Sequence, residues 1–188
     1  METMTMRTSR LLVTLFTLVT AASAAAASDP KAAAPAATMK SGGAEFGYFV
    51  GTWKCKESWA KSPFGEAYES TSTLIASNDT DGVWIAWSYV QDPSANNPHP
   101  PKGNDLWGYD PAKKAFVRNK YDNYAPGAVT HLTSKGFIGD TISWDGPVQT
   151  PKGAVPFKHT FKKLDDKTIE GRLSVGGKEF YKGKCTKS

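Results

Sequence analysis

From residue 51 to its C-terminus, the chain is a succession of short strand-forming runs separated by turn signals, and this pattern constrains its fold most. Val, Ile, Thr, Tyr, Phe and Trp concentrate in these runs, and residues suited to tight turns separate them. The predicted strands span 51–59, 67–77, 83–91, 104–109, 114–121, 127–133, 138–145, 155–163, 167–175 and 178–185. No helical periodicity extends over a useful length. We therefore expect an all-β fold, either a sandwich or an up-and-down antiparallel barrel of about ten strands.

The first 27 residues have the pattern of a signal peptide. Arg7 and Arg10 precede an apolar run over 11–19, and small alanine-rich residues follow it. The apolar run is too short for a membrane-spanning helix, and small residues rather than a cluster of charge come after it. We therefore expect 1–27 to be removed and the protein to be periplasmic or secreted, without a membrane span.

Beyond the signal peptide, composition indicates a linker and one domain. Residues 28–44 are mostly Ala, Pro, Ser, Gly and Lys, which favours a flexible linker. The remaining segment, 45–188, has about 144 residues and matches the common size of one domain, here a single β-barrel. Of the 21 basic residues that follow the signal peptide, 19 are lysines spread along the chain. Nucleic-acid binding usually shows an arginine-rich stripe, so we expect no nucleic-acid partner.

The chain has two cysteines, Cys55 and Cys185, and they lie in the first and last predicted strands. Each alternates with residues other than lysine, while lysines mark the opposite face of both strands. In an exported chain this favours a disulfide, which requires Cα atoms within about 7 Å of each other. The first and last strands would then be neighbours and the sheet would close into a barrel. Two free thiols, or a bridge between the facing sheets of a sandwich, are the alternatives.

Two proline-containing segments, 92–104 and 146–153, are expected to be loops at the rim. The first holds four of the twelve prolines, and proline cannot donate to the ladder of a central strand. If both loops lie at the same end of a barrel, they shape its mouth.

Three sequence segments resemble known families. The segments are "FVGTW" over 49–53, "LWGYDPAKKAFVRNKYDNY" over 106–124 and "KEFYKGKCTK" over 178–187. The Gly-x-Trp element resembles the start of lipocalins and other calycins, and the set resembles a family of secreted bacterial lipocalin-like domains of unknown function. Nitrobindins, a related group of ten-stranded barrels, hold haem through a histidine near the C-terminus. This chain has no histidine after His159, so we expect no haem and no other cofactor.

The resemblance implies structural roles at the closed end of a barrel. Gly51 would let the backbone approach neighbouring strands, and Trp53 would fill the tapering floor. Arg172 would stack on Trp53 there.

Candidate ligand-binding residues come from the strands that would line a barrel interior. Arg118 shares a strand face with Phe116 and could pair with a ligand carboxylate or phosphate, although Lys120 on the same face suggests solvent. His159 alternates with apolar residues and should face inward. The full set of candidates is Trp59, Trp107, Tyr109, Arg118, Tyr121, His159 and Tyr181. Side chains could instead fill the interior completely.

The sequence contains no motif for a metal site or an activated nucleophile. We therefore expect an exported lipocalin-like barrel that binds a small hydrophobic or amphipathic molecule without changing it. One alternative is an enzyme that uses the same cavity, with His159 or Glu57 as acid or base. Another is a structural or interaction barrel with a filled core.

Overall fold

The computed structural model describes residues 42–61, 66–123, 128–150 and 153–188. The predicted signal peptide, 1–27, lies outside the described residues, as does all but the last three residues of the predicted linker.

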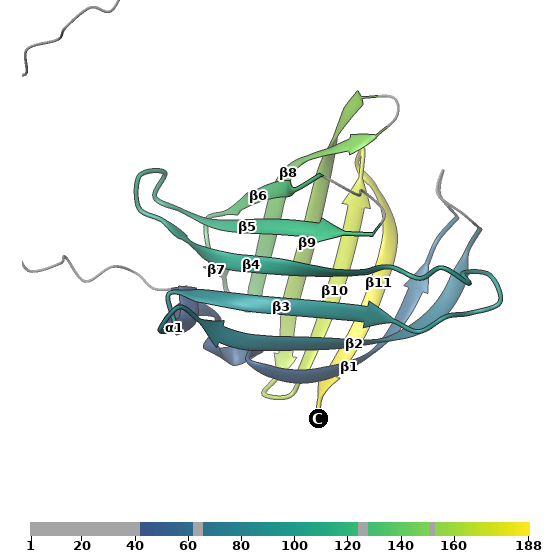
Figure 1. The fold of residues 1–188 in the computed structure, drawn as a ribbon, viewed down its shortest axis with the longest axis horizontal. Helices are drawn as coiled ribbons and strands as arrows, with labels where there is room; N and C mark the ends of the chain where they lie inside the picture. Colours follow the sequence, from purple (N-terminus) through teal and green to yellow (C-terminus); the bar gives the residue numbers. More distant parts are fainter. Residues whose placement is uncertain (1–41, 62–65, 124–127, 151–152) are drawn as a thin grey trace, which may run out of the picture. The chain divides into compact units, whose positions relative to one another are not determined.

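The described residues form a barrel of antiparallel strands (Figure 1). The strands are β1 (Gly51–Trp59), β2 (Tyr68–Asp79), β3 (Trp84–Gln91), β4 (Lys102–Asp110), β5 (Ala115–Asp122), β6 (Thr130–Ser134), β7 (Phe137–Ile138), β8 (Thr141–Thr150), β9 (Gly153–Asp165), β10 (Thr168–Val175) and β11 (Lys178–Lys187). Their order is β6-β5-β4-β3-β2-β1-β11-β10-β9-β8-β7, and a pairing of β6 with β8 closes the ring. The two-residue strand β7 pairs only with β8, so ten strands make up the wall of the described barrel. The predicted closed up-and-down barrel is confirmed.

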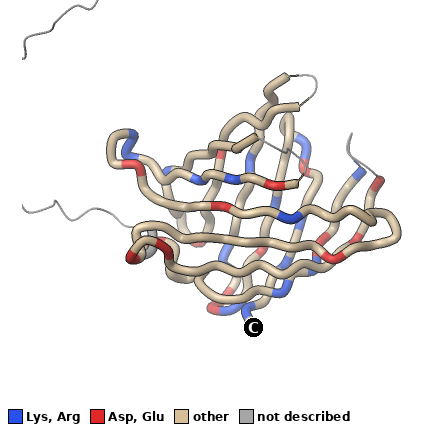
Figure 2. Tube along the Cα trace, in the orientation of Figure 1, with Lys and Arg blue, Asp and Glu red and all other residues tan. Residues whose placement is uncertain are grey.

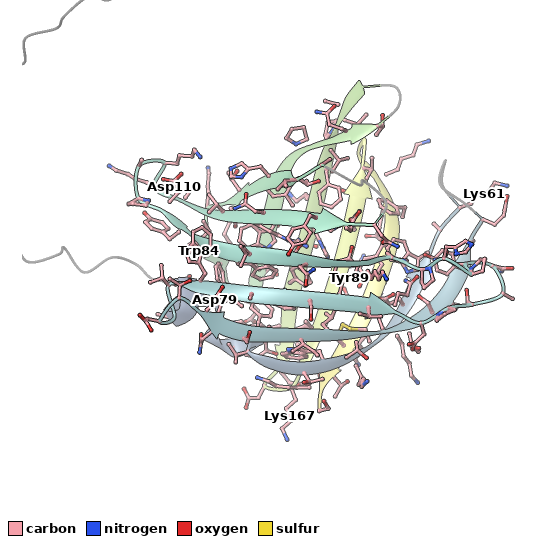
Figure 3. All side chains as sticks on the ribbon, in the orientation of Figure 1. Lys61, Asp79, Trp84, Tyr89, Asp110 and Lys167 are labelled. Atoms are coloured by element: carbon pink, nitrogen blue, oxygen red, sulfur yellow. A yellow bond between two sulfur atoms is a disulfide. The ribbon has the colours of Figure 1, made fainter. Side chains whose placement is uncertain are left out.

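The disulfide between Cys55 and Cys185 is present and joins β1 to β11 (Figure 3). The two cysteines lie directly opposite each other in the register of these strands, and both are buried. The prediction that the first and last strands are neighbours in the sheet is therefore confirmed. This pairing of the first and last strands closes the up-and-down ring. The shortest ladder of the ring lies between β6 and β8, where the register has the single pair Thr133 and Asp145.

One of the two predictions of a rim loop is wrong. Residues 146–150 and Gly153 lie in strands, because β8 and β9 continue as paired strands up to Thr150 and Gly153; residues 151–152 lie outside the described residues. Pro147 lies opposite Pro156 in this hairpin. The two residues that lack a backbone N–H donor therefore share one position of the ladder. The other expected loop connects β3 to β4 and ends at Lys102, two residues before the predicted strand start.

Lysines cover part of the outer surface, as the alternation predicts. Lys54 and Lys56 of β1, and Lys182 and Lys184 of β11, are exposed, while the residues between them face inward. Figure 2 shows this distribution, with basic residues on the strands around β11 and no charged residue on β3.

Aromatic side chains fill one end of the barrel, which we call the closed half. The short helices α1 (Gly42–Phe46) and η1 (Gly47–Phe49) bring Phe46 and Phe49 into it, and both are fully buried. Trp53 lies beside them and donates its indole N–H to the Phe49 carbonyl at 2.7 Å. The Trp87 and Trp107 rings stack with centroids 4.5 Å apart. Edge and stacked contacts of this kind add to the free energy of burying the rings themselves.

Gly51 and Trp53 lie at the start of β1, and Trp53 is fully buried. Gly51 has a φ of +132°, and a Cβ there would lie 2.7 Å from Lys187 Cε. The Lys187 ammonium donates to the Tyr48 carbonyl at 3.0 Å and lies 5.2 Å from the centroid of the Trp53 ring. The cation over Trp53 is therefore Lys187 and not Arg172. Arg172 lies on the outer surface, where it forms ion pairs with Glu170 and Glu179.

Candidate functional site

The other end of the barrel contains a cavity of about 460 Å³, a volume typical of small-molecule sites. We call this end the open half. Its apolar lining includes Leu74 of β2, Trp87 of β3, Phe157 of β9, and Leu173 and Val175 of β10. The interior is thus divided, with packed rings at one end and a cavity at the other. The two expected alternatives, a filled and a hollow interior, each describe one half of the barrel.

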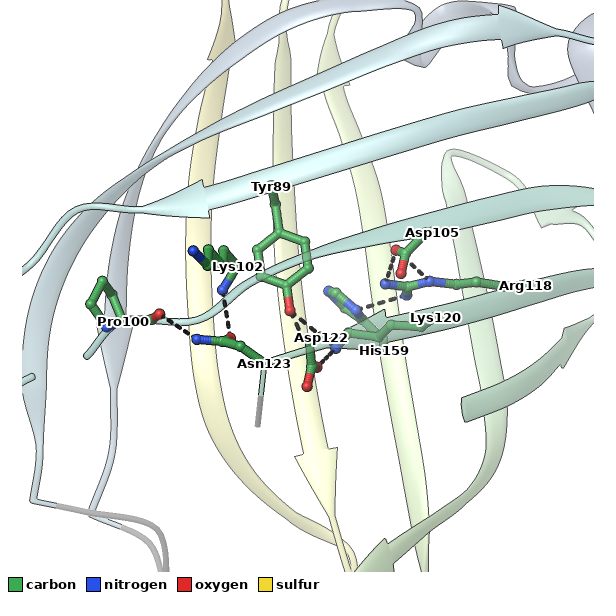
Figure 4. A network of polar contacts seen from close by, with 9 residues as sticks. All are labelled: Tyr89, Pro100, Lys102, Asp105, Arg118, Lys120, Asp122, Asn123 and His159. Atoms are coloured by element: carbon green, nitrogen blue, oxygen red, sulfur yellow. Dashed lines mark hydrogen bonds and ion pairs between the residues drawn. The ribbon is translucent and has the colours of Figure 1, made fainter. Parts of the chain in front are cut away.

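Arg118 lies at the base of the cavity, on the inward face of β5, and is 2% exposed. Its Nε donates to Asp105 Oδ2 at 2.9 Å, and its Nη2 forms an ion pair with the same oxygen. Its Nη1 donates to His159 Nδ1 at 2.9 Å (Figure 4). The Nε–Nη2 edge of the guanidinium, which could bind a carboxylate through two parallel hydrogen bonds, is therefore already occupied by Asp105. A ligand carboxylate or phosphate could use this edge of Arg118 only by displacing Asp105.

His159 faces inward from β9, as its alternation predicts, and it lines the cavity. Guanidinium nitrogens only donate hydrogen bonds, so His159 Nδ1 must accept from Arg118 and the ring proton must sit on Nε2. Burial, together with the positive charges of Arg118 and Lys120, holds the pKa of His159 well below its ordinary value of 6.5. The imidazole is neutral near pH 7. Its Nε2 has no hydrogen-bond partner among the described residues.

Glu57 is a buried carboxylate in the cavity wall, and five neutral groups can donate to it. The shortest of these hydrogen bonds come from the Ser72 hydroxyl at 2.6 Å and the Gln91 amide at 2.7 Å. The other donors are Ser70, Trp59 and Tyr181. No basic residue among the described ones forms an ion pair with Glu57. Its hydrogen-bonding capacity is met, but its charge has no counter-ion.

A third polar group involves the end of β5. Lys120 points inward, forms an ion pair with Asp122 and donates to the Tyr89 hydroxyl at 3.2 Å (Figure 4). Burial, followed by the charge of Asp122, raises the pKa of Tyr89 far above 10. The expectation that Lys120 marks a solvent-facing side of β5 is wrong, because Asp122 on the same face supplies its counter-charge inside the barrel.

Four of the seven candidate ligand-binding residues line the cavity, namely Trp59, Arg118, His159 and Tyr181. The other three lie elsewhere. Trp107 is fully buried in the aromatic cluster of the closed half, and Tyr109 packs edge-on against Phe116. Tyr121 is half exposed on the outer face of β5, because Arg118, Lys120 and Asp122 take the inward positions of that strand.

Sequence reasoning missed three polar residues of the cavity wall and its surroundings: Gln91, Asp105 and Asp122. Strand alternation carried a signal for each. Asp105 is two residues from the inward Trp107, and Gln91 is two residues from Tyr89. This signal was overlooked because polar residues were expected to face solvent. In the structure, each of these three side chains is paired with another side chain inside the barrel.

Within the described ranges, no group of three or more His, Cys, Asp or Glu side chains is placed to hold a metal ion. The described residues also include no helix long and apolar enough to cross a membrane.

The fold and the cavity define a closed antiparallel β-barrel whose interior is hollow at one end. No family model matches the chain, and no curated protein matches it.

Proposed function

We propose that this protein is an exported, lipocalin-like carrier that binds a small apolar or amphipathic molecule in the open half without changing it chemically. The observation that carries this proposal is the divided interior. The closed half is filled by buried aromatic rings in contact with one another, and the open half keeps a cavity of about 460 Å³ with aromatic and aliphatic walls. A barrel with only a structural role would have no reason to leave such apolar surface uncovered.

The alternative of acid–base catalysis finds little support in the two residues expected to perform it. The only basic nitrogen of neutral His159, Nδ1, accepts a hydrogen bond from Arg118, so it cannot also take a proton from a ligand. Glu57 is surrounded by five donors of the protein itself. Both groups are held by their neighbours and not poised for proton transfer.

Two observations support the lipocalin-like and exported parts of the proposal. Gly51 and Trp53 lie at the closed end, where the Gly-x-Trp resemblance places them. The Cys55–Cys185 disulfide is a bond that persists in oxidising compartments outside the cytoplasm, which agrees with the signal-peptide pattern of 1–27.

The carrier proposal can be tested by filling the cavity. Leu74 lines it, whereas its neighbour Ile75 is half exposed on the outer face of the same strand. Leu74→Trp should abolish binding of the apolar dye Nile red in a fluorescence titration, and Ile75→Trp should bind the dye as the wild type does. Native mass spectrometry of protein purified from the periplasm should show a co-purifying small molecule. Equal dye binding by both variants, or repeated empty spectra with no response to the dye, would contradict the proposal.

A further inference from the structure

We propose that the ligand is an organic cation, an apolar body that carries one amine or quaternary ammonium group. This inference rests on the proposed carrier function and specifies its ligand class. Three features of the open half lead to it: the balance of buried charge, the position of the unbalanced carboxylate, and the aromatic rings around that carboxylate.

The buried charges that line the cavity do not cancel. The Arg118 guanidinium is paired with Asp105, and the Lys120 ammonium is paired with Asp122. Each of these pairs is neutral overall. Glu57 remains, 6% exposed, and no basic residue in the described part of the chain is paired with it. The interior therefore has one negative charge in excess.

Neutral donors meet the hydrogen-bonding capacity of Glu57 but leave its negative charge unpaired. The hydroxyls of Ser70, Ser72 and Tyr181 and the N–H groups of Gln91 and Trp59 satisfy its oxygens. Dipoles do not neutralise a net charge, and buried charges in proteins are normally paired with an opposite charge. Because Glu57 lines a cavity, the missing counter-ion can come from a ligand. A second carboxylate oxygen, Asp105 Oδ1, is also buried without a hydrogen-bond donor among the described residues.

Aromatic rings surround the same region of the cavity. Trp59 stacks on Tyr68 with ring centroids 5.8 Å apart and contacts Tyr181 at 4.7 Å. All three residues line the cavity together with Glu57. The electron-rich faces of tryptophan and tyrosine attract cations, most strongly where water is excluded. A carboxylate behind aromatic walls is thus suited to an ammonium group, while Leu74, Phe157 and Leu173 are suited to an apolar body.

An anionic ligand finds no unpaired cation among the described residues of this cavity, and the one uncommitted donor of His159, Nε2–H, belongs to a neutral ring. Both cations that line it, Arg118 and Lys120, are already held by carboxylates. A ligand carboxylate would compete with Asp105 or Asp122 for a cation that is already paired, and it would still meet the excess charge of Glu57. We therefore expect the cavity to discriminate against anions.

The test compares three probes with the same body: 6-phenylhexylammonium, 6-phenylhexan-1-ol and 6-phenylhexanoate. Each is titrated at pH 7 by isothermal calorimetry and by the fluorescence of the cavity-lining tryptophans Trp59 and Trp87. The ammonium should bind at least tenfold more tightly than the alcohol, and the carboxylate should bind most weakly. If the alcohol or the carboxylate binds as tightly as the ammonium, the cation proposal is overturned while the carrier function stands. If none of the three probes binds, the carrier function fails as well.

Variants assign the preference to Glu57. Glu57→Gln keeps the side-chain shape and should reduce the ammonium affinity to within about twofold of the alcohol affinity. Glu69→Gln removes the same charge from an exposed position on β2 and should leave the preference unchanged. Since Glu57→Gln turns an amide toward several donors, its fold is checked by circular dichroism. Trp59→Leu provides a second route, because it should weaken the ammonium severalfold and the alcohol much less. A preference that survives both Glu57→Gln and Trp59→Leu would refute the assignment.

Discussion

At the scale of single residues, the interior positions follow from alternation along each strand, and their roles follow from partners that are distant in the sequence. His159 could be placed inside from Phe157 and Phe161, but its lowered pKa depends on burial in the closed ring and on the charge of Arg118, 41 residues away. Lys187 takes the place over Trp53 that the resemblance implied for Arg172, because β11 extends two residues beyond Cys185 and pairs there with the start of β1. Alternation predicts which face of the strand a side chain occupies, but it does not predict which other side chain it contacts.

The depressed pKa of His159 makes the stability of the fold depend on pH. Its pKa is lower in the folded protein than the value of about 6.5 in an unfolded chain. Below pH 6.5 the unfolded state therefore binds a proton that the folded state does not. This contribution to stability is complete above pH 7 and declines as the pH falls from about 6.5 toward the folded pKa, by up to about 1.4 kcal/mol per pH unit.

Urea unfolding of the wild type and of His159→Gln between pH 7.5 and 5 measures this contribution. Glutamine keeps an acceptor for Arg118 and does not titrate. The unfolding free energy of the wild type should decrease relative to that of His159→Gln as the pH falls. A difference that is constant over this range would show that His159 titrates normally in the folded state.

The positive φ of Gly51 predicts a local cost for any side chain at this position. Gly51→Ala combines a strained backbone with a collision against Lys187, so it should lower the unfolding free energy by about 1–3 kcal/mol. Gly47→Ala is the matched control, because a Cβ at Gly47 meets no atom within 4 Å, and it should change stability by less than about 0.5 kcal/mol. Equal stabilities of the two variants in urea unfolding would contradict this account of Gly51.

At the scale of strands and turns, nearly all strands could be predicted from runs of β-forming residues, since each run ends at Gly, Asn, Asp or Pro. The strands of the β8–β9 hairpin were predicted over 138–145 and 155–163, but their extension over 146–150 and 153–154 was not, because Pro147 suggested a loop. Pro147 and Pro156 are tolerated since they face each other in register, and that pairing is visible only once the strands are aligned. The disulfide correctly indicated that β1 and β11 are neighbours, but no sequence signal indicated that the ladder between β6 and β8 is as short as one register pair.

The two seams of the barrel should differ in stability. β1 and β11 pair through seven register positions and a disulfide, whereas β6 and β8 share one. Amide hydrogens of β6 should therefore exchange with solvent at least tenfold faster than those of β1, because local opening requires fewer broken contacts. Hydrogen exchange followed by mass spectrometry gives this comparison. Equal protection of β6 and β1 would show that the two seams are equally strong.

At the scale of the whole molecule, the disulfide closes nearly the entire described barrel into one loop, because the cysteines are separated by 130 positions in the sequence. In the chain-entropy estimate such a loop contributes about 5 kcal/mol to stability. The Cys55→Ala/Cys185→Ala protein should remain folded through its β1–β11 pairing but lose about 3–5 kcal/mol of unfolding free energy, measured with urea. A loss below about 1 kcal/mol would show that strand pairing alone defines this seam.

The division of the interior also belongs to this scale, and only part of it could be predicted. The abundance of aromatic residues indicated a large core, and the alternation indicated which rings face inward. Whether those rings meet depends on the barrel radius and on α1 and η1, which insert Phe46 and Phe49 into the closed half only. The cavity of the open half is therefore a property of the closed ring and not of any one strand.

The most direct measurement of this division is a crystal structure of the protein soaked with 1-bromohexane, with the bromine located by its anomalous signal. The account predicts a bromine peak in the open half, among Leu74, Phe157 and Leu173, and none among the packed rings around Trp107 in the closed half. An open half filled by its own side chains and without a peak, or a peak within the closed half, would contradict the account.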